Sequence, residues 1–303
     1  MKVTPGISQG EWNEKQLAWG QVSRRKFLKA AAAVLAGVTV VGAGGLAYAV
    51  KIEPNWIDVV RQTIRLPRLD TAFNGFRLAQ LSDIHLSSAT TIAEVSDAVR
   101  RMVAEKPDLV AITGDFIDDR PTLRSSISAL GAELAKLNEQ VPVIAILGNH
   151  DYRMGAQEIR AMLIHAGITL LDNQVYSLER SGARLHLAGL DDIQWGRPDL
   201  SAVLQQIPES GAAILLAHEP DYADVAAAAG RFDLQISGHT HGGQVVLPLA
   251  GPLVLPEMGH RYPSGLYQVG QMLQYTNRGL GTTAPHVRFH CRPEITIFTL
   301  QAG

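Results

Sequence analysis

The sequence predicts a layered α/β domain from about residue 55 to residue 303. Short apolar runs alternate with helical patterns up to about residue 243, which is typical of sheets covered by helices. After residue 243, strand-like runs separated by Gly and Pro predict antiparallel strands. Polar residues follow directly after the apolar runs, where open α/β sheets bind ligands at the carboxyl ends of their strands.

The elements of this domain are predicted from apolar periodicity. In residues 91–105, for example, Ile92, Val95 and Val99 recur at helical spacing. The predicted helices are 91–105, 121–138, 155–166 and a short one that ends near residue 230. The predicted strands are 76–81, 109–113, 143–147, 175–179, 184–189, 213–217, 234–237, 266–269, 272–276 and 295–300.

The composition excludes several classes of protein. Of 303 residues, 46% are hydrophobic and 18% are charged, which excludes intrinsic disorder. A single Cys excludes a disulfide framework. The net charge is −2, from 27 Lys and Arg against 29 Asp and Glu. Nucleic-acid binding without sequence preference needs a basic face, so we expect no nucleic-acid partner.

The N-terminus is predicted to be an export signal. Residues 1–29 carry six Lys or Arg against two Asp or Glu, and residues 30–50 are 21 uncharged, mostly apolar residues. A basic stretch before an apolar run is typical of a signal, and Ser-Arg-Arg-Lys-Phe-Leu-Lys at 23–29 resembles the twin-arginine (Tat) signal. The apolar segment is long enough to span a bilayer, and Ala-Tyr-Ala at 47–49 offers a cleavage site. Release after Ala49 and retention as an anchor both remain open.

Five predicted strands are followed by residues that can bind metal ions. Each of the five loops delivers Asp, Asn or His to the same edge of the fold. The candidate ligands are Asp83, His85, Asp115, Asn149, His218, His239 and His241. Taken singly, such an Asp could be a helix cap and such a His a surface residue.

The residue types of this set indicate its chemistry. Mixed carboxylate, amide and imidazole ligands suit Mn, Fe or Zn rather than a Cys-rich structural zinc site. Seven ligands exceed what one such ion binds, but they are enough for two ions if one carboxylate bridges them. A pair of divalent ions is a common device for hydrolysing phosphate esters, because it activates water and clamps the reacting oxygens.

In this order the motifs resemble the calcineurin-like metallophosphoesterase superfamily. The series DxH, GDxxD, GNHD, a single His and GHTH covers residues 83–241. GHTHGGQVVLPLAGPLVLP, NRGLGTT and RPEITIFTL are more similar still to its YaeI/YkuE-type bacterial phosphodiesterase branch, which is also associated with twin-arginine export. The resemblance implies a four-layer α/β/β/α sandwich of two mixed sheets flanked by helices.

The resemblance also implies a role for each residue of the motifs. Asp83, His85 and His241 would hold the first metal ion. Asn149, His218 and His239 would hold the second, and Asp115 would bridge the two. A hydroxide between the ions would attack phosphorus. His150 would contact the phosphate and protonate the leaving oxygen or steady its charge, oriented by Asp118.

One position departs from the superfamily's pattern. In its protein phosphatases, GDxxD continues with Arg, but here Asp119 stands at that position and Arg120 follows. We therefore do not expect protein phosphatase activity, and Arg153 or Arg278 could take the place of the missing Arg. Gly242 and Gly243 are predicted to let the backbone pass close to the metals. Cys291 is predicted to be a buried small side chain rather than a nucleophile.

These observations predict a phosphodiesterase with two divalent ions that acts outside the cytoplasmic membrane. Its partners would be a small phosphoester or lipid-linked phosphate, the Tat translocase during export, and the membrane itself. One alternative is a pyrophosphatase acting on a nucleotide-linked lipid precursor. Another is a membrane-tethered binding protein that has lost activity.

Overall fold

The computed structural model describes residues 44–303. The twin-arginine motif 23–29 and residues 30–43 of the predicted apolar segment lie outside the described residues. Residues Leu46–Gly303 form one unit by their internal contacts. Within 44–303, no helix has the length and hydrophobicity needed to span a bilayer. The domain boundaries proposed from the sequence stay predictions.

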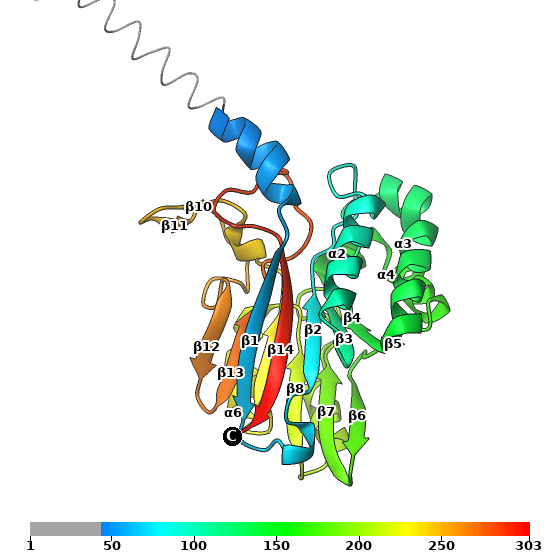
Figure 1. Cartoon of the computed structure of the whole chain (residues 1–303), viewed down its shortest axis with the longest axis vertical. Helices are drawn as coiled ribbons and strands as arrows, with labels where there is room; N and C mark the ends of the chain where they lie inside the picture. Colours follow the sequence, from blue (N-terminus) through cyan, green and yellow to red (C-terminus); the bar gives the residue numbers. More distant parts are fainter. Residues whose placement is uncertain (1–43) are drawn as a thin grey trace, which may run out of the picture. The chain divides into compact units, whose positions relative to one another are not determined.

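Two six-stranded mixed sheets form the centre of this unit (Figure 1). The first sheet has the order β1 (Asp58–Leu66), β14 (Glu294–Ala302), β2 (Arg77–Leu81), β3 (Leu109–Thr113), β4 (Val143–Ile146) and β5 (Thr169–Leu170). The second has the order β12 (Gly265–Val269), β13 (Met272–Thr276), β9 (Leu234–Ser237), β8 (Ala212–Leu216), β7 (Ala183–Gly189) and β6 (Gln174–Arg180). The central strands β2, β3 and β4 run parallel, as do β7, β8 and β9.

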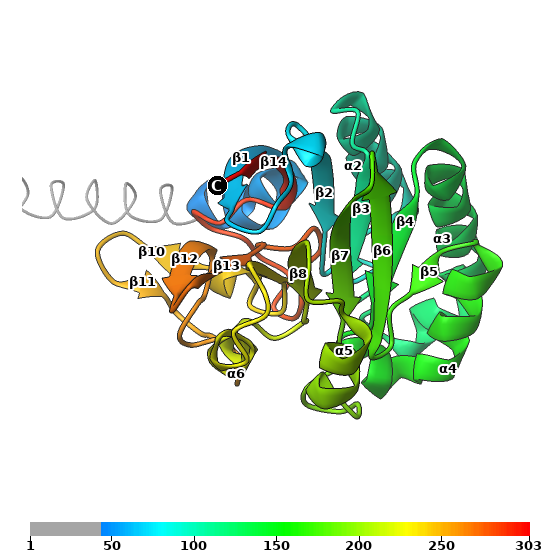
Figure 2. The same cartoon turned by 90° about the horizontal axis from the view of Figure 1, so that it is seen from below.

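Helices cover the outer face of each sheet (Figure 2). The first sheet carries α2 (Ile92–Ala104), α3 (Arg120–Gln140) and α4 (Asn149–His165). The second carries α5 (Leu200–Gln206) and α6 (Ala223–Ala228). The inner faces of the two sheets pack on each other in a separate core. The predicted four-layer sandwich is therefore confirmed.

The sequence of β3 shows how each strand serves two cores. All five of its residues, Leu-Val-Ala-Ile-Thr, are buried. Leu109 and Ala111 point into the core between the sheets, whereas Val110 and Ile112 pack against the helices. A strand buried on both faces reads as a continuous apolar run, and successive side chains alternate between the faces.

Parts of the fold differ from the sequence prediction, including helix α5, which was not predicted. The antiparallel pairing predicted after residue 243 is confirmed in part, since β12 pairs antiparallel with β13 and β14 with β2, whereas β13 lies parallel to β9 and β14 parallel to β1. Strand β1 was not predicted, since its exposed positions carry polar and charged residues such as Arg61. Helix α4 begins at Asn149 rather than at 155, and Gly155 interrupts it with φ 160°.

Short elements complete the unit. The small hairpin of β10 (Val246–Leu247) and β11 (Gly251–Pro252) follows the last motif of the predicted site. A π-helical turn at Tyr48–Ile52 precedes the first sheet. The 3-10 turns are Glu53–Asn55, Thr71–Phe73, Pro220–Tyr222 and His241–Gly243.

Candidate metal centre

The carboxyl ends of strands from both sheets meet at one place. Asp83 and His85 follow β2, Asp115 and Asp118 follow β3, and His218 follows β8. Asn149 and His150 lie in the first turn of α4, and His239 and His241 follow β9. The structure joins all nine predicted site residues in one connected set of close side-chain and backbone contacts.

The first group of candidate ligands contains Asp83, His85 and His241, all buried. Nε2 of His241 lies 3.0 Å from Nε2 of His85 and 3.5 Å from Oδ1 of Asp83. Two imidazole nitrogens that face each other beside a carboxylate can share at most one proton. A divalent cation would satisfy both lone pairs, so this group fits a metal ion.

Asp115 connects this group to a second one. Its Oδ2 lies 3.2 Å from Nε2 of His85 and 3.2 Å from Nε2 of His218. Its other oxygen accepts a hydrogen bond from the backbone N–H of His150. One carboxylate oxygen thus faces a ligand nitrogen of each group, as a bridging ligand must.

The second group contains Asn149, His218 and His239. Nδ1 of His218 lies 2.7 Å from the carbonyl oxygen of Thr113, so its Nε2 is the nitrogen available to a metal. Nε2 of His239 lies 2.7 Å from the carbonyl oxygen of Glu257, and its Nδ1 faces Oδ1 of Asn149 at 3.2 Å. Each imidazole is oriented by a backbone carbonyl, which is typical of metal-binding histidines.

Buried nitrogens of the site also fit a metal centre. Nε2 of His218 and Nδ1 of His241 are buried without a hydrogen-bond partner. Burial opposes a charge on His218, but Asp115 outweighs it and raises the pKa of this imidazole well above its usual value. Burial likewise opposes a charge on His85, yet hydrogen bonds to Asp115 and Asp118 raise its pKa to about 10. A metal ion would replace these protons.

Asp118 lies between two histidines. Its Oδ1 is 3.2 Å from Nδ1 of His85 and 3.1 Å from Nδ1 of His150, the latter without the angle of a hydrogen bond. Burial would raise the pKa of Asp118, but these two imidazoles hold it well below its usual value. Asp118 therefore stays ionised and can orient His150, whose side chain is half-buried at the edge of the site.

The backbone around the site is strained. Five of the seven candidate ligands have positive φ, namely Asp83, His85, Asp115, His239 and His241. Non-glycine residues rarely adopt this conformation, and such strain concentrates at functional sites. A Cβ atom on Gly242 would lie 2.7 Å from Sγ of Cys291, so only glycine fits there. Cys291 is buried, as predicted.

Sequence reasoning missed Asp151. This buried carboxylate accepts hydrogen bonds from the backbone N–H groups of Asp115, Phe116 and Gly148 at 2.8–2.9 Å. It thereby fixes the loop after β3 to the start of α4 and positions Asp115. Its position in the sequence could have indicated this role. Asp151 is the last residue of the GNHD motif and the third residue of a helix, where a carboxylate can accept hydrogen bonds from free backbone N–H groups.

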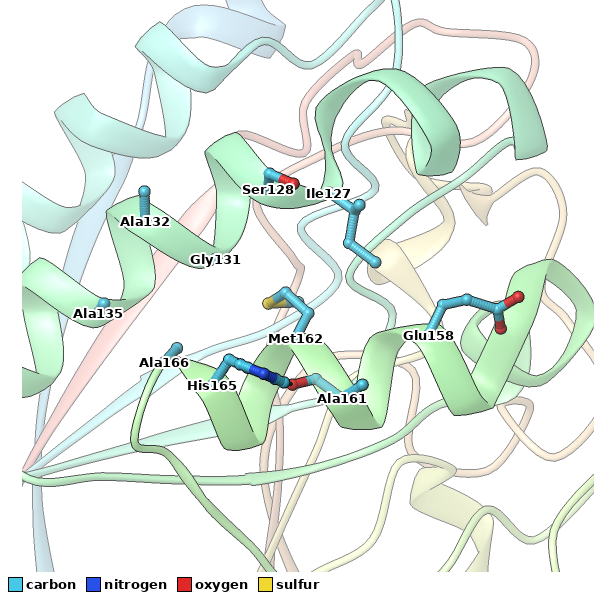
Figure 3. A pocket seen from close by; sticks show the side chains of 10 residues that line it. All are labelled: Ile127, Ser128, Gly131, Ala132, Ala135, Glu158, Ala161, Met162, His165 and Ala166. Carbon is cyan, nitrogen blue, oxygen red and sulfur yellow. Dashed lines mark hydrogen bonds between the residues drawn. The ribbon is translucent and has the colours of Figure 1, made fainter.

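Two cavities differ in their relation to this site. One of about 340 Å³ is lined by Asp115, Asn149, His150, His239 and His241, among others. Another of about 570 Å³ lies between α3 and α4, where Met162 points toward Gly131 (Figure 3). The larger cavity is mostly apolar and contains none of the predicted site residues, so the smaller one is the candidate active site.

Two arginines, Arg153 and Arg278, were considered for phosphate binding. Neither is among the described residues that line the smaller cavity. Arg278 is paired with Glu294 and Asp58 beneath the site. Asp119 caps α3 by accepting a hydrogen bond from the backbone N–H of Thr122 at 2.7 Å. The residue at the position where Arg was expected in a protein phosphatase is thus the N-cap of α3 here.

Residues 76–243 match the family model described as calcineurin-like phosphoesterase. The chain belongs to the calcineurin-like phosphoesterase family. This confirms the family that the motifs predicted.

Three relatives show how far the similarity of this calcineurin-like phosphoesterase extends. It is 37% identical over 284 residues to the uncharacterized metallophosphoesterase YkuE of Bacillus subtilis (strain 168), covering 93% of this chain and 99% of YkuE. It is 33% identical over 286 residues to phosphodiesterase YaeI of Escherichia coli (strain K12), and the match covers 92% of this chain and 99% of YaeI. A transmembrane protein with metallophosphoesterase domain from Danio rerio is 32% identical over 263 residues, and the match covers 82% of this chain and 57% of that protein.

Family and site agree on the type of chemistry. This calcineurin-like phosphoesterase is a metal-dependent phosphoester hydrolase, which confirms the prediction of an enzyme. Its metal-ligand residues are clustered and buried. The assignment of each residue to one ion stays a prediction.

Proposed function

We propose that the protein is a phosphodiesterase that uses two divalent ions and acts outside the cytoplasmic membrane. The position of Asp115 carries the proposal of two ions. Its Oδ2 lies 3.2 Å from a ligand nitrogen of each group, so one oxygen can serve two ions. A single-ion site would leave one of the two groups without a function.

The residues of the two groups would divide the work. Asp83, His85 and His241 would hold one ion, and Asn149, His218 and His239 the other. When bound, the ions supply an activated water and offset the negative charge of the phosphate. Mn, Zn or Fe each suit this mixture of ligands.

His150 would handle the proton of the leaving group. Its Nδ1 faces Asp118, which leaves Nε2 free to reach the substrate. Water loses one proton to the solvent and adds to phosphorus as hydroxide, one P–O ester bond breaks, and the departing oxygen takes a proton from Nε2 of His150, which the solvent then restores. The ionised Asp118 stabilises the charged imidazole that donates this proton.

Diester cleavage is favoured over phosphatase activity by two observations. The relative YaeI, which matches nearly the whole chain, is named a phosphodiesterase. Asp119 occupies the position where protein phosphatases carry an Arg, and it is engaged as the N-cap of α3. A phosphodiester has one negative charge fewer than a monoester, so it depends less on an added cation.

Export is proposed from the N-terminal sequence. The twin-arginine motif 23–29 and the apolar segment 30–50 would direct the chain to the Tat translocase. Retention as an anchor is supported by Ala49, because its carbonyl oxygen accepts a hydrogen bond from the backbone N–H of Arg288 at 2.9 Å. Ala49 also lies inside a helical turn, where a signal peptidase would find no extended segment to cut.

The test combines metal content with substrate preference. Full-length protein purified in detergent would be loaded with Mn²⁺ and measured by plasma mass spectrometry. Hydrolysis of bis(p-nitrophenyl) phosphate would be compared with that of p-nitrophenyl phosphate. About two ions per chain and faster diester cleavage are expected; one ion per chain, or faster monoester cleavage, would contradict the proposal.

A further inference from the structure

The cavity at the candidate active site has one polar and one apolar wall. The polar wall holds four of the seven candidate metal ligands, together with His150. The apolar wall is formed by Val245, Leu253, Val254, Pro285 and Val287. A small hydrophilic phosphoester would gain nothing from this wall, whereas an alkyl chain next to the phosphate would bury apolar surface against it.

The apolar wall continues outward into the β10–β11 hairpin. Residues 245–256 contain no charged side chain. Leu249 at the tip is fully exposed, and Val254 is 75% exposed. Soluble proteins rarely expose contiguous apolar side chains of this size unless the surface meets a partner or a membrane.

Backbone hydrogen bonds link the hairpin to the start of the described unit. The N–H of Val246 donates to the carbonyl of Phe289 at 2.9 Å. The N–H of the neighbouring Arg288 donates to the carbonyl of Ala49, also at 2.9 Å. The hairpin and the turn at Tyr48–Ile52 therefore flank the same short segment, and Figure 1 shows them at the same end of the sheets.

The turn at Tyr48–Ile52 adds exposed apolar side chains of its own. Val50 and Ile52 are 41% and 54% exposed. The predicted apolar segment 30–50 ends within this turn, so the chain enters the described unit beside the hairpin. A bilayer is then the surface that is available to cover Leu249 and its neighbours.

We infer that the β10–β11 hairpin rests in the surface of a lipid bilayer, and that the substrate is a phosphodiester carrying an apolar chain held in that bilayer. The inference rests on the proposed phosphodiesterase function. The phosphate would enter between the metal groups while its chain lies along Val245, Leu253 and Val287. A membrane-embedded substrate then needs to move only from the bilayer surface into the adjoining cavity.

The depth of the hairpin tests the bilayer contact directly. The one native cysteine, Cys291, is buried, so an environment-sensitive dye will react with a thiol introduced by Leu249→Cys. The full chain would be reconstituted into vesicles of phosphatidylcholine and phosphatidylglycerol in equal parts. We expect the dye emission to shift to the blue and to be quenched by spin-labelled lipid.

The matched control is Ile164→Cys, an exposed apolar position on α4 outside the hairpin. Its dye should stay unquenched in the same vesicles. Equal quenching at both positions, or none at 249, would overturn the inference. The dye at 249 would also be measured without lipid. A blue shift of its emission that increases with protein concentration would overturn the inference, because a second copy of the chain would then cover the hairpin.

Chain-length dependence tests the substrate class. Methyl, butyl and octyl p-nitrophenyl phosphate would be compared below their micelle-forming concentrations. Each methylene that enters the apolar wall should lower KM about fourfold, because its burial is worth about 0.8 kcal/mol. Val287→Ser should reduce this gain per methylene, and a KM independent of chain length in the unaltered protein would overturn the inference.

The two tests separate the inference from the proposed function. Absence of diester turnover from metal-loaded protein would overturn the phosphodiesterase proposal and the substrate class with it. Normal turnover of the methyl ester with a dye at 249 that remains in water would overturn only the inference. Leu247→Ser with Leu249→Ser should leave methyl ester turnover unchanged, since neither residue lines the cavity.

Discussion

Asp115 is the residue on which both metal groups depend. We predict that Asp115→Ala loses both ions together, because its Oδ2 faces a ligand nitrogen in each group at 3.2 Å. Metal content would be measured by plasma mass spectrometry after dialysis. The control is Asp119→Ala, which removes a helix cap worth about 1 kcal/mol and leaves the ligands intact. Retention of a full pair of ions would refute the bridging role.

His150 is predicted to act on the substrate rather than on the metals. His150→Ala should keep the metal content and lower kcat by about 10²–10⁴, the usual contribution of a positioned proton donor. Diester turnover and metal content would be measured on the same preparation. Asp118→Asn should give a smaller loss of kcat, because it leaves the imidazole in place without its orienting charge. Loss of metal in His150→Ala would make this histidine a ligand instead.

Single residues of the site could be predicted because their types and order are informative. Asp83, His85 and His241 stand in motifs whose residue types and spacing can be read directly from the sequence. Asp151 could not be found in this way, since an acidic residue in the first turn of a helix has an ordinary explanation as a cap. Its three backbone partners become visible only when β3 and β4 are side by side.

The segment after β13 shows how one buried side chain organises an entire element. The guanidinium of Arg288 is fully buried and donates to the carbonyl oxygens of Arg278, Gly279, Gly281 and Cys291 at 2.6–3.1 Å. The N–H of Gly281 in turn donates to the carbonyl of Asp83. This segment therefore supports the loop that carries the first metal group.

Arg288→Met should destabilise the protein by about 3 kcal/mol or more, because it leaves several buried carbonyl groups without a donor. Urea unfolding of the metal-free protein would measure the change. Arg292→Met is the control, since Arg292 is partly exposed and pairs with Asp58 at the surface. If the two variants unfolded at the same urea concentration, the buried guanidinium would not have the proposed structural role.

Elements were predictable where both faces of a strand are buried. The runs at β3, β4 and β8 are continuously apolar and bounded by polar or glycine residues. Strand β1 has exposed polar positions and depends on β14 for its place, although about 230 residues separate them in the chain. Such a pairing leaves no local pattern in the sequence, which is why β1 was not predicted.

The candidate metal centre joins the two sheets. Without metal, the carboxylates of the site favour the charged imidazoles of His85 and His218, and the pKa of His85 is raised to about 10. A histidine whose pKa is raised on folding stabilises the folded state below its unfolded pKa of about 6.5. This stabilisation is lost as the pH rises toward the folded pKa. Metal affinity instead increases as the pH rises, because an imidazole must lose its proton before it can bind a metal ion.

The stabilisation by metal should therefore increase with pH. We predict that the melting temperatures of Mn-loaded and EDTA-treated protein differ more at about pH 8.5 than at about pH 6, a range in which the raised histidines would otherwise keep their protons. At a free metal concentration of about 100 times Kd, the bound ion adds about 2.7 kcal/mol to the free energy of unfolding. Asp115→Ala should abolish the difference at both pH values. A difference that shrinks as the pH rises would show that protons and metal do not compete for these imidazoles.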